Sequence, residues 1–155
     1  MGIEIERKFL LVGEAWKKLA QGVRYRQGYL STSKESTVRV RTIENTGYLT
    51  VKGKSTGATR SEFEYEIPVE DANAMLDQLC AKPLIEKNRY KIDYQGFTWE
   101  VDEFFGENQG LVVAEVELES EDQFYAKPEW VGAEVTQDQR YFNSNLARNP
   151  YCSWE

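Results

Sequence analysis

The sequence contains no histidine. That absence excludes Ser-His-Asp and Cys-His catalysis, and with them any zinc site built on histidine. The two cysteines, Cys80 and Cys152, lie far apart and show no metal-ligand spacing. We expect them to be free thiols, which indicates a reducing compartment.

Long apolar segments and an excess of positive charge are also absent. No apolar run is long enough to span a bilayer, and the N-terminus carries Glu4, Glu6, Arg7 and Lys8 where a signal peptide needs apolar residues. We therefore expect a cytoplasmic protein without membrane contact. The formal net charge of −7 indicates repulsion from nucleic acid. The length of 155 residues suits a single domain over residues 1–155.

Alternation of polar and apolar residues dominates the chain and predicts β-strands. Residues 24–30 form a further strand whose facing is ambiguous, because both parities are partly polar and Gly28 can bend it. The count is about eight strands, the number at which a small barrel can close around side chains or one small ligand. The other alternating segments are residues 3–9, 38–41, 48–52, 62–67, 87–91, 100–102 and 112–119.

Helices are predicted between the strands. Residues 14–21 are a short candidate, and residues 70–81 are a firmer one because apolar residues recur on one side. Capping-box patterns predict helices over 121–126 and 137–147. The expected fold is α+β: a closed antiparallel barrel with helices packed outside and a C-terminal helix near one mouth.

The charged residues are sorted by strand. Acids occupy residues 4–6, 62–66, 100–102 and 115–119, whereas bases occupy 39–41 and 87–91. Alternation alone fits equally well a sandwich whose charged faces contact water. Sorting of the charges, together with helices that can cover the apolar faces, favours a barrel with its charges inside.

A bore lined in this way points to a particular class of ligand. Carboxylates crowded in a bore raise one another's pKa values, and a divalent cation relieves that cost. Oxygen ligands of this kind suit Mg²⁺ or Mn²⁺ rather than zinc. Facing them, arginine and lysine suit phosphate oxygens. The expected partner is a small-molecule polyanion that arrives with a metal.

A family resemblance covers essentially the whole chain. The segment Glu4-Ile5-Glu6-Arg7-Lys8 is similar to the ExExK signature of the CYTH domain, or triphosphate tunnel metalloenzyme, superfamily. Later segments follow in that family's order, and residues 135–147 look like the closing helix of short bacterial members, which include inorganic triphosphatases. The resemblance implies an eight-stranded tunnel that hydrolyses or rearranges triphosphates. The later segments are residues 39–41, 50–52, 62–64, 87–90, 100–102 and 115–117.

The resemblance also implies roles for individual residues. Tyr29 sits where short bacterial relatives have a tyrosine proposed as a proton acceptor, although a packing role fits it equally well. Glu62, Glu64 and Asp102 would help with metal, water or the positioning of bases. The implied metal ligands are Glu4, Glu6, Glu62, Asp102, Glu115 and Glu117; the implied substrate ligands are Lys8, Arg39, Arg41, Lys52, Lys87 and Arg89; the implied catalytic residues are Tyr29, Lys8 and Glu64; and Glu66, Lys91 and Glu119 are read as rim charges.

The reaction that the resemblance implies is divalent-metal-dependent hydrolysis of inorganic tripolyphosphate to pyrophosphate and phosphate. An adenylyl cyclase of class IV type and a thiamine triphosphatase are the alternatives within the superfamily. A non-catalytic polyphosphate-binding module is the alternative of another class. Both acid pairs, Glu4 with Glu6 and Glu115 with Glu117, are present, which favours metal catalysis. A homodimer is left open.

Overall fold

One nine-stranded antiparallel sheet is the framework of the described part of the molecule. The computed structural model describes residues 2–33 and 35–154. The strands are β1 (Ile3–Leu11), β2 (Val23–Thr32), β3 (Ser36–Ile43), β4 (Thr46–Gly53), β5 (Thr59–Ile67), β6 (Ile85–Tyr94), β7 (Phe97–Phe104), β8 (Val112–Glu117) and β9 (Val131–Glu134).

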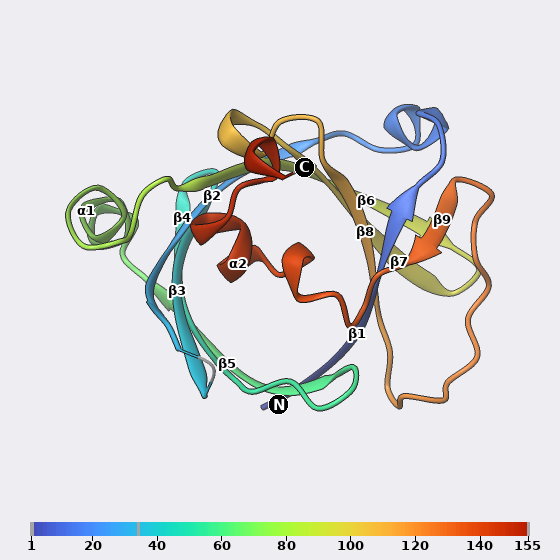
Figure 1. Ribbon diagram of the computed structural model, residues 1–155, viewed down its shortest axis with the longest axis horizontal. Coiled ribbons are helices and arrows are strands. Elements are labelled where there is room, and N and C mark those ends of the chain that lie inside the picture. Colours follow the sequence, from blue (N-terminus) through green and yellow to red (C-terminus); the bar gives the residue numbers. More distant parts are fainter. Residues whose placement is uncertain (1, 34, 155) are drawn as a thin grey trace.

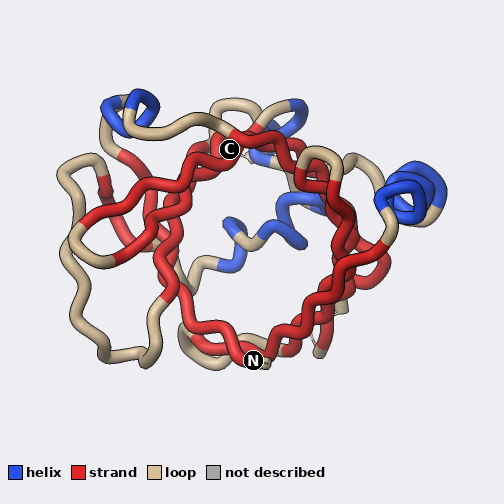
Figure 2. The backbone as a smooth tube through the Cα atoms, turned by 180° about the vertical axis from the view of Figure 1, so that it is seen from behind, coloured by secondary structure: helices blue, strands red, loops and turns tan. Residues whose placement is uncertain are grey.

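The sheet closes on itself as a barrel. Its strand order is β5-β4-β3-β2-β6-β7-β8-β1, and β1 pairs again with β5, so eight strands complete a ring (Figures 1 and 2). Strand β1 pairs through residues 3–5 with β5 and through residues 6–10 with β8. The ninth strand, β9, adds to the end of β1 outside the ring. The predicted closed barrel is confirmed, and the open sandwich is wrong.

The outer face of the barrel carries the largest apolar core. Trp99 is fully buried there, and its ring lies 5.5 Å from Phe9 and 6.1 Å from Trp130, measured between centroids. Tyr125 packs against the same group. Residues 118–130 therefore cover this face as an irregular segment, and the helix predicted over 121–126 is wrong. The need to insert Tyr125 and Trp130 into the core outweighs a local capping pattern.

The helices are short and few among the described residues. Helix α1 (Val69–Gln78) confirms the helix predicted over 70–81 and packs on β3 and β4 through Ala72 and Leu76. The helix predicted over 14–21 is only a 3₁₀ turn, η1 (Ala15–Lys18). The remaining turns are η2 (Gly106–Asn108) and η4 (Tyr151–Ser153). No helix in the described part of the chain is long and apolar enough to cross a membrane.

The helix predicted over 137–147 is interrupted. It consists of a 3₁₀ turn, η3 (Gln139–Tyr141), and helix α2 (Asn143–Arg148). Phe142 separates them because its backbone is extended, with φ −68° and ψ 133°. The interruption turns the chain across the end of the barrel instead of along it.

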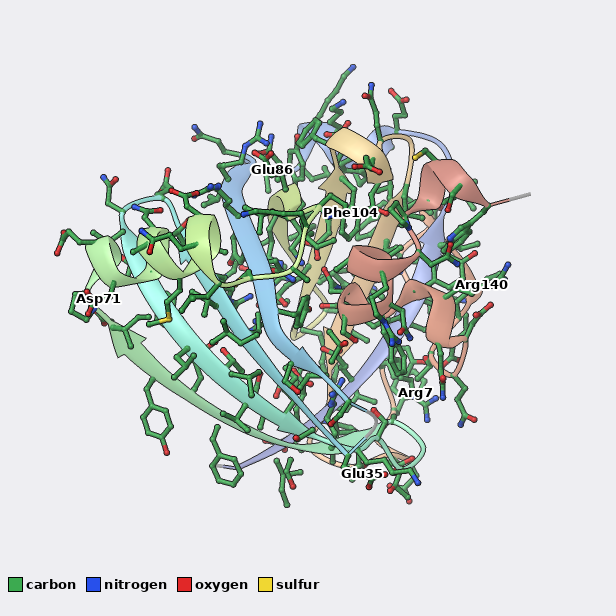
Figure 3. The ribbon with its side chains drawn as sticks, turned by 60° about the vertical axis from the view of Figure 1, so that its left-hand side comes forward. Arg7, Glu35, Asp71, Glu86, Phe104 and Arg140 are labelled. Carbon is green, nitrogen blue, oxygen red and sulfur yellow. The ribbon has the colours of Figure 1, made fainter. Side chains whose placement is uncertain are left out.

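The C-terminal segment, residues 136–154, closes one end of the bore and is called the plug below. Figure 1 shows α2 lying across the barrel opening. Tyr141 and Leu146 of the plug pack in one cluster with Ile85 and Phe104, and Phe104 is labelled near the plug in Figure 3. Ile85 and Phe104 have the inward parity of Lys87 on β6 and Asp102 on β7. The bore thus has an apolar floor, and its charged part lies above that floor.

The facing of β2 is settled by its neighbours. Tyr25 and Tyr29 are buried and face the bore, whereas Arg26 bonds outward to Asp77 of α1. Gly28 faces outward beneath the end of α1. A Cβ on Gly28 would lie 2.8 Å from Cβ of Cys80. The glycine therefore permits the close approach of this segment, and the irregular register of β2 lies just beyond it, between Tyr29 and Ser31.

Candidate active site

The bore above the plug contains a cavity of about 250 Å³. Every predicted site residue except Asp102 lines it. Glu100, which the sequence analysis did not select, lines it instead of Asp102, and the plug contributes Phe142, Asn143 and Ser144. The residues read as rim charges, Glu66, Lys91 and Glu119, are exposed and lie outside its lining.

Two walls of opposite charge face each other across this cavity. Strands β3, β2 and β6 are consecutive in the ring, and the two outer ones carry Arg39, Arg41, Lys87 and Arg89. We call these four residues the basic wall. Strands β7, β8, β1 and β5 are also consecutive, and they carry most of the carboxylates. Segregation by strand in the sequence therefore becomes segregation in space. The acidic wall is Glu100, Glu115, Glu117, Glu4, Glu6 and Glu62.

Tyr25 supports the basic wall from below. Its ring centroid lies 4.8 Å from the Cζ atom of Arg89, 5.2 Å from Cζ of Arg41 and 5.9 Å from Nζ of Lys87. The electron-rich face of an aromatic ring attracts cations at such distances. Tyr25 thus contacts three of the four basic-wall residues, a neighbour of the site that sequence reasoning missed. The signal was its shared parity with Tyr29 on β2.

The arginines of the basic wall repel one another. Burial, together with the charges of Arg39 and Arg89, lowers the pKa of Arg41 to about 10. The Nε atoms of Arg39 and Arg41 are buried and have no hydrogen-bond partner among the described residues. Buried donors are normally paired, so these two indicate that the wall is built to meet an acceptor.

Glu64 holds this pair of arginines. Its carboxylate accepts hydrogen bonds from Arg39 at 3.3 Å, from Arg41 at 3.2 Å and from the Thr50 hydroxyl at 2.7 Å. Partial burial opposes its ionisation, but the Thr50 hydrogen bond and the two arginines outweigh that cost and lower the pKa of Glu64. A carboxylate in this state is a weak base and a good anchor for cations.

Asp102 lies behind the basic wall. It is 2% exposed and accepts hydrogen bonds from Lys87 at 2.8 Å and from Arg89 at 2.8 and 2.9 Å. Burial opposes its ionisation, but the charges of Arg89 and Lys87 outweigh it and lower the pKa of Asp102. Burial also lowers the pKa of Lys87 to about 7, with Asp102 only partly offsetting the cost. Both carboxylate oxygens of Asp102 are therefore engaged by bases.

Lysines bridge part of the acidic wall. Lys52 donates to Glu4 at 3.1 Å, and Lys8 pairs with Glu115 and lies 3.6 Å from Glu6. Burial opposes the charge on Lys8, but Glu115 and Glu6 outweigh it and raise the pKa of Lys8. Lys8 thus stays protonated within the acidic wall.

The remaining acids are crowded. Partial burial and the neighbouring Glu4, Glu6 and Glu62 raise the pKa of Glu117 to about 7. Burial and the charge of Glu115 raise the pKa of Glu6 as well. Within residues 2–33 and 35–154, no three acids converge as a ready-made metal cluster, since several point to lysines. A divalent cation fits this donor set, because it would relieve the repulsion that raises these pKa values.

Comparison with known proteins agrees with the geometry. The sequence matches the CYTH domain family over residues 2–149, and the chain belongs to that family. It is 61% identical to a protein named inorganic triphosphatase from Acetivibrio thermocellus, over all of this chain and 99% of that one. It is 38% identical to an inorganic triphosphatase from Nitrosomonas europaea, over 93% of this chain and 96% of that one.

A solved structure supports the same grouping. The crystal structure of an inorganic triphosphatase superposes on this barrel with a TM-score of 0.67 and 34% sequence identity. The match covers 93% of each chain. The resemblance stated from the sequence is thereby confirmed at the level of the family.

Proposed function

We propose that this protein is a divalent-metal-dependent inorganic triphosphatase that hydrolyses tripolyphosphate to pyrophosphate and orthophosphate. The observation that carries the proposal is the basic wall, with two unpaired buried Nε donors, facing a crowded acidic wall in one closed-end cavity. Relatives that carry the name inorganic triphosphatase support the choice of substrate. A chain of three phosphates presents the acceptors and negative charge that such a wall lacks.

The basic wall binds the phosphate chain in this proposal. Arg39, Arg41 and Arg89 donate to its oxygens, and Lys52 and Lys8 add donors from the side of the acids. Glu64 and Asp102 position the bases, because their oxygens already accept from arginine and lysine. We therefore propose a positioning role for these two residues, in place of the metal and catalytic roles that the resemblance implied for Asp102 and Glu64.

The acidic wall holds the metal in this proposal. Glu4, Glu6, Glu115 and Glu117 are the oxygen ligands for Mg²⁺ or Mn²⁺, with Glu62 beside them. A bound divalent cation supplies charge neutralisation on phosphate oxygens and lowers the pKa of water. Phosphoryl transfer needs little covalent help from the protein beyond positioning and electrostatic stabilisation. Lys8, held protonated by its carboxylate neighbours, stabilises charge that develops on the phosphate under attack.

Tyr29 has a polar contact besides its packing. The ring belongs to the apolar cluster at the plug, while the hydroxyl accepts a hydrogen bond from Nε2 of Gln27 at 3.3 Å. Since Gln27 provides the donor, the proton of the Tyr29 hydroxyl is available to the cavity that Tyr29 lines. We propose that Tyr29 exchanges a proton with the attacking water or the leaving phosphate.

Metal dependence is the first expected result. Excess chelator should abolish phosphate release from tripolyphosphate, and Mg²⁺ or Mn²⁺ should restore it, because the crowded acids need a cation. Glu117→Gln should raise the metal concentration that gives half-maximal activity. Glu119→Gln, at the exposed rim, is the matched control and should leave that concentration unchanged. Full turnover in metal-free buffer would contradict the metal assignment.

Substrate preference is the second expected result. Tripolyphosphate should give a higher kcat/KM than ATP, because it carries charge at both ends and needs no ordering of a nucleoside at the mouth. The measurement is a side-by-side assay that separates products by chromatography.

Other outcomes of that assay point to other functions. Cyclic AMP as the main product from ATP would indicate an adenylyl cyclase, and a clear preference for thiamine triphosphate would indicate that hydrolase. Tight binding without turnover under either metal would indicate a polyphosphate-binding module.

We further propose a cytoplasmic location, supported by two free cysteines, Cys80 and Cys152. The oligomeric state stays a prediction to be measured.

A further inference from the structure

Asn143 joins the plug to the basic wall. It is the first residue of α2, and it lines the cavity. Its side-chain oxygen Oδ1 accepts from Nζ of Lys87 at 3.1 Å and from Nε2 of Gln27 at 3.2 Å. Lys87 and Gln27 are both fully buried, so these contacts fix the side chain at the deep end of the bore.

The orientation of the amide follows from its partners. Lys87 already donates to Asp102, and an amine can donate N–H to both acceptors in either of its protonation states. The atom of Asn143 that faces Lys87 is therefore the oxygen, and its nitrogen Nδ2 must point elsewhere. Among the described residues, Nδ2 donates no hydrogen bond, since both side-chain hydrogen bonds of Asn143 use Oδ1. Two N–H donors are left for whatever fills the cavity.

We propose that Nδ2 of Asn143 donates a hydrogen bond to the deepest phosphoryl group of the substrate, so that the plug supplies a substrate-binding residue. This inference rests on the proposed function, since it names a ligand of the same site. A neutral donor suits this position because Lys87 and Arg89 already share the single carboxylate of Asp102. Another cation there would be buried without a partner, which is costly.

A purely structural role for Asn143 would require a different chemical group at this position than substrate binding does. To hold the plug against Lys87 and Gln27, residue 143 needs only an acceptor oxygen. Aspartate has the same shape and keeps that acceptor, but it lacks the donor and brings negative charge toward the phosphate. Asn143→Asp therefore separates binding of substrate from support of the fold, which Asn143→Ala alone would not do.

The experiment compares Asn143→Asp, Asn143→Ala and Asn145→Ala. Asn145 is on the same helix, but its Nδ2 donates to the Gln139 carbonyl, so its variant controls for disturbance of the plug. We expect Asn143→Asp to unfold in urea like the wild type and to raise the KM for tripolyphosphate about 10- to 100-fold, the loss expected for a hydrogen bond to a charged group. Asn145→Ala should keep the wild-type KM.

A second measurement keeps the inference independent of turnover. Binding of tripolyphosphate is measured by calorimetry in excess chelator, where no hydrolysis is expected. If the wild type binds tripolyphosphate but does not hydrolyse it with either metal, the proposed function fails. Weaker binding by Asn143→Asp would still support the proposed hydrogen bond from Asn143 to a phosphoryl group. A wild-type dissociation constant for Asn143→Asp, or no tripolyphosphate binding by the wild type at all, would overturn the inference.

Discussion

Asp102→Ala should lower the free energy of unfolding by about 3–5 kcal/mol, the cost of breaking a buried ion pair by removing one partner. The carboxylate is 2% exposed, and it is the group that accepts from both Lys87 and Arg89. Without it, the Lys87 amine at 1% exposure keeps only the neutral Asn143 oxygen as an acceptor, and the nearby charge of Arg89 repels it. Urea denaturation followed by tryptophan fluorescence measures the loss.

Two further variants test the cause of that loss. Replacing both partners, Lys87→Met with Asp102→Leu, removes the unpaired lysine and should recover much of the stability. Arg89 would still pair with Glu100 at 3.2 Å and Glu115 at 3.5 Å. Removing an exposed carboxylate, Glu86→Ala, should cost less than about 1 kcal/mol, since exposed ion pairs such as its pair with Arg24 contribute little. A loss for Asp102→Ala no larger than this would mean that the buried network does not carry the stability assigned to it.

Strand parity explains how far the sequence could predict the site. Alternate residues of a strand face the same side, so the sequence alone places Glu4, Glu6 and Lys8 together on one face. Once the strands close into a ring, the charged parity points into the bore on most of them; β2 is the exception, because Tyr25 and Tyr29 face inward and Arg26 faces outward. Most of the predicted site residues line one cavity for this reason.

Strand parity does not predict how deep along the bore a side chain lies. Asp102 has the parity of Glu100, yet Glu100 lines the cavity and Asp102 lies behind the bases. The stagger between neighbouring strands and the position of the plug set that depth, and both arise from contacts between residues distant in sequence. Asn143 was missed for the same reason, because its role depends on Lys87, which lies 56 residues away in the chain.

Local sequence patterns gave wrong predictions where contacts with distant residues determine how a segment packs. The capping pattern before residues 121–126 is present, and the Gln123 side chain does return to the backbone N–H of Glu119. No helix follows the capping pattern, because Tyr125 and Trp130, which come after Gln123, pack on the barrel around Trp99. A pattern of four residues cannot indicate how strongly a core formed by distant parts of the chain attracts an aromatic ring.

Arg41→Ala should affect activity and stability differently. We expect kcat/KM for tripolyphosphate to fall about 10- to 100-fold, because each charge-assisted hydrogen bond contributes roughly 1.5–3 kcal/mol. We expect the free energy of unfolding to stay the same or to rise. Burial, together with the charges of Arg39 and Arg89, lowers the pKa of Arg41 to about 10, so removing Arg41 relieves both costs in the free protein. Substrate-binding sites often carry such strain, and their variants gain stability as they lose function.

The matched control for this prediction is an arginine on the neighbouring strand. Arg26 faces outward from β2 and bonds to Asp77 of α1, so Arg26→Ala should keep the wild-type kinetics. If Arg41→Ala destabilised the fold and kept its activity, the arginine would serve the barrel and not the substrate. Lost activity with unchanged or raised stability would mean that Arg41 serves the substrate. The free protein then carries the repulsion within the basic wall, and bound substrate relieves it. The same reasoning predicts that tripolyphosphate raises the unfolding temperature of the wild type more than that of Arg41→Ala, since at a given concentration the tighter-binding ligand stabilises the fold more.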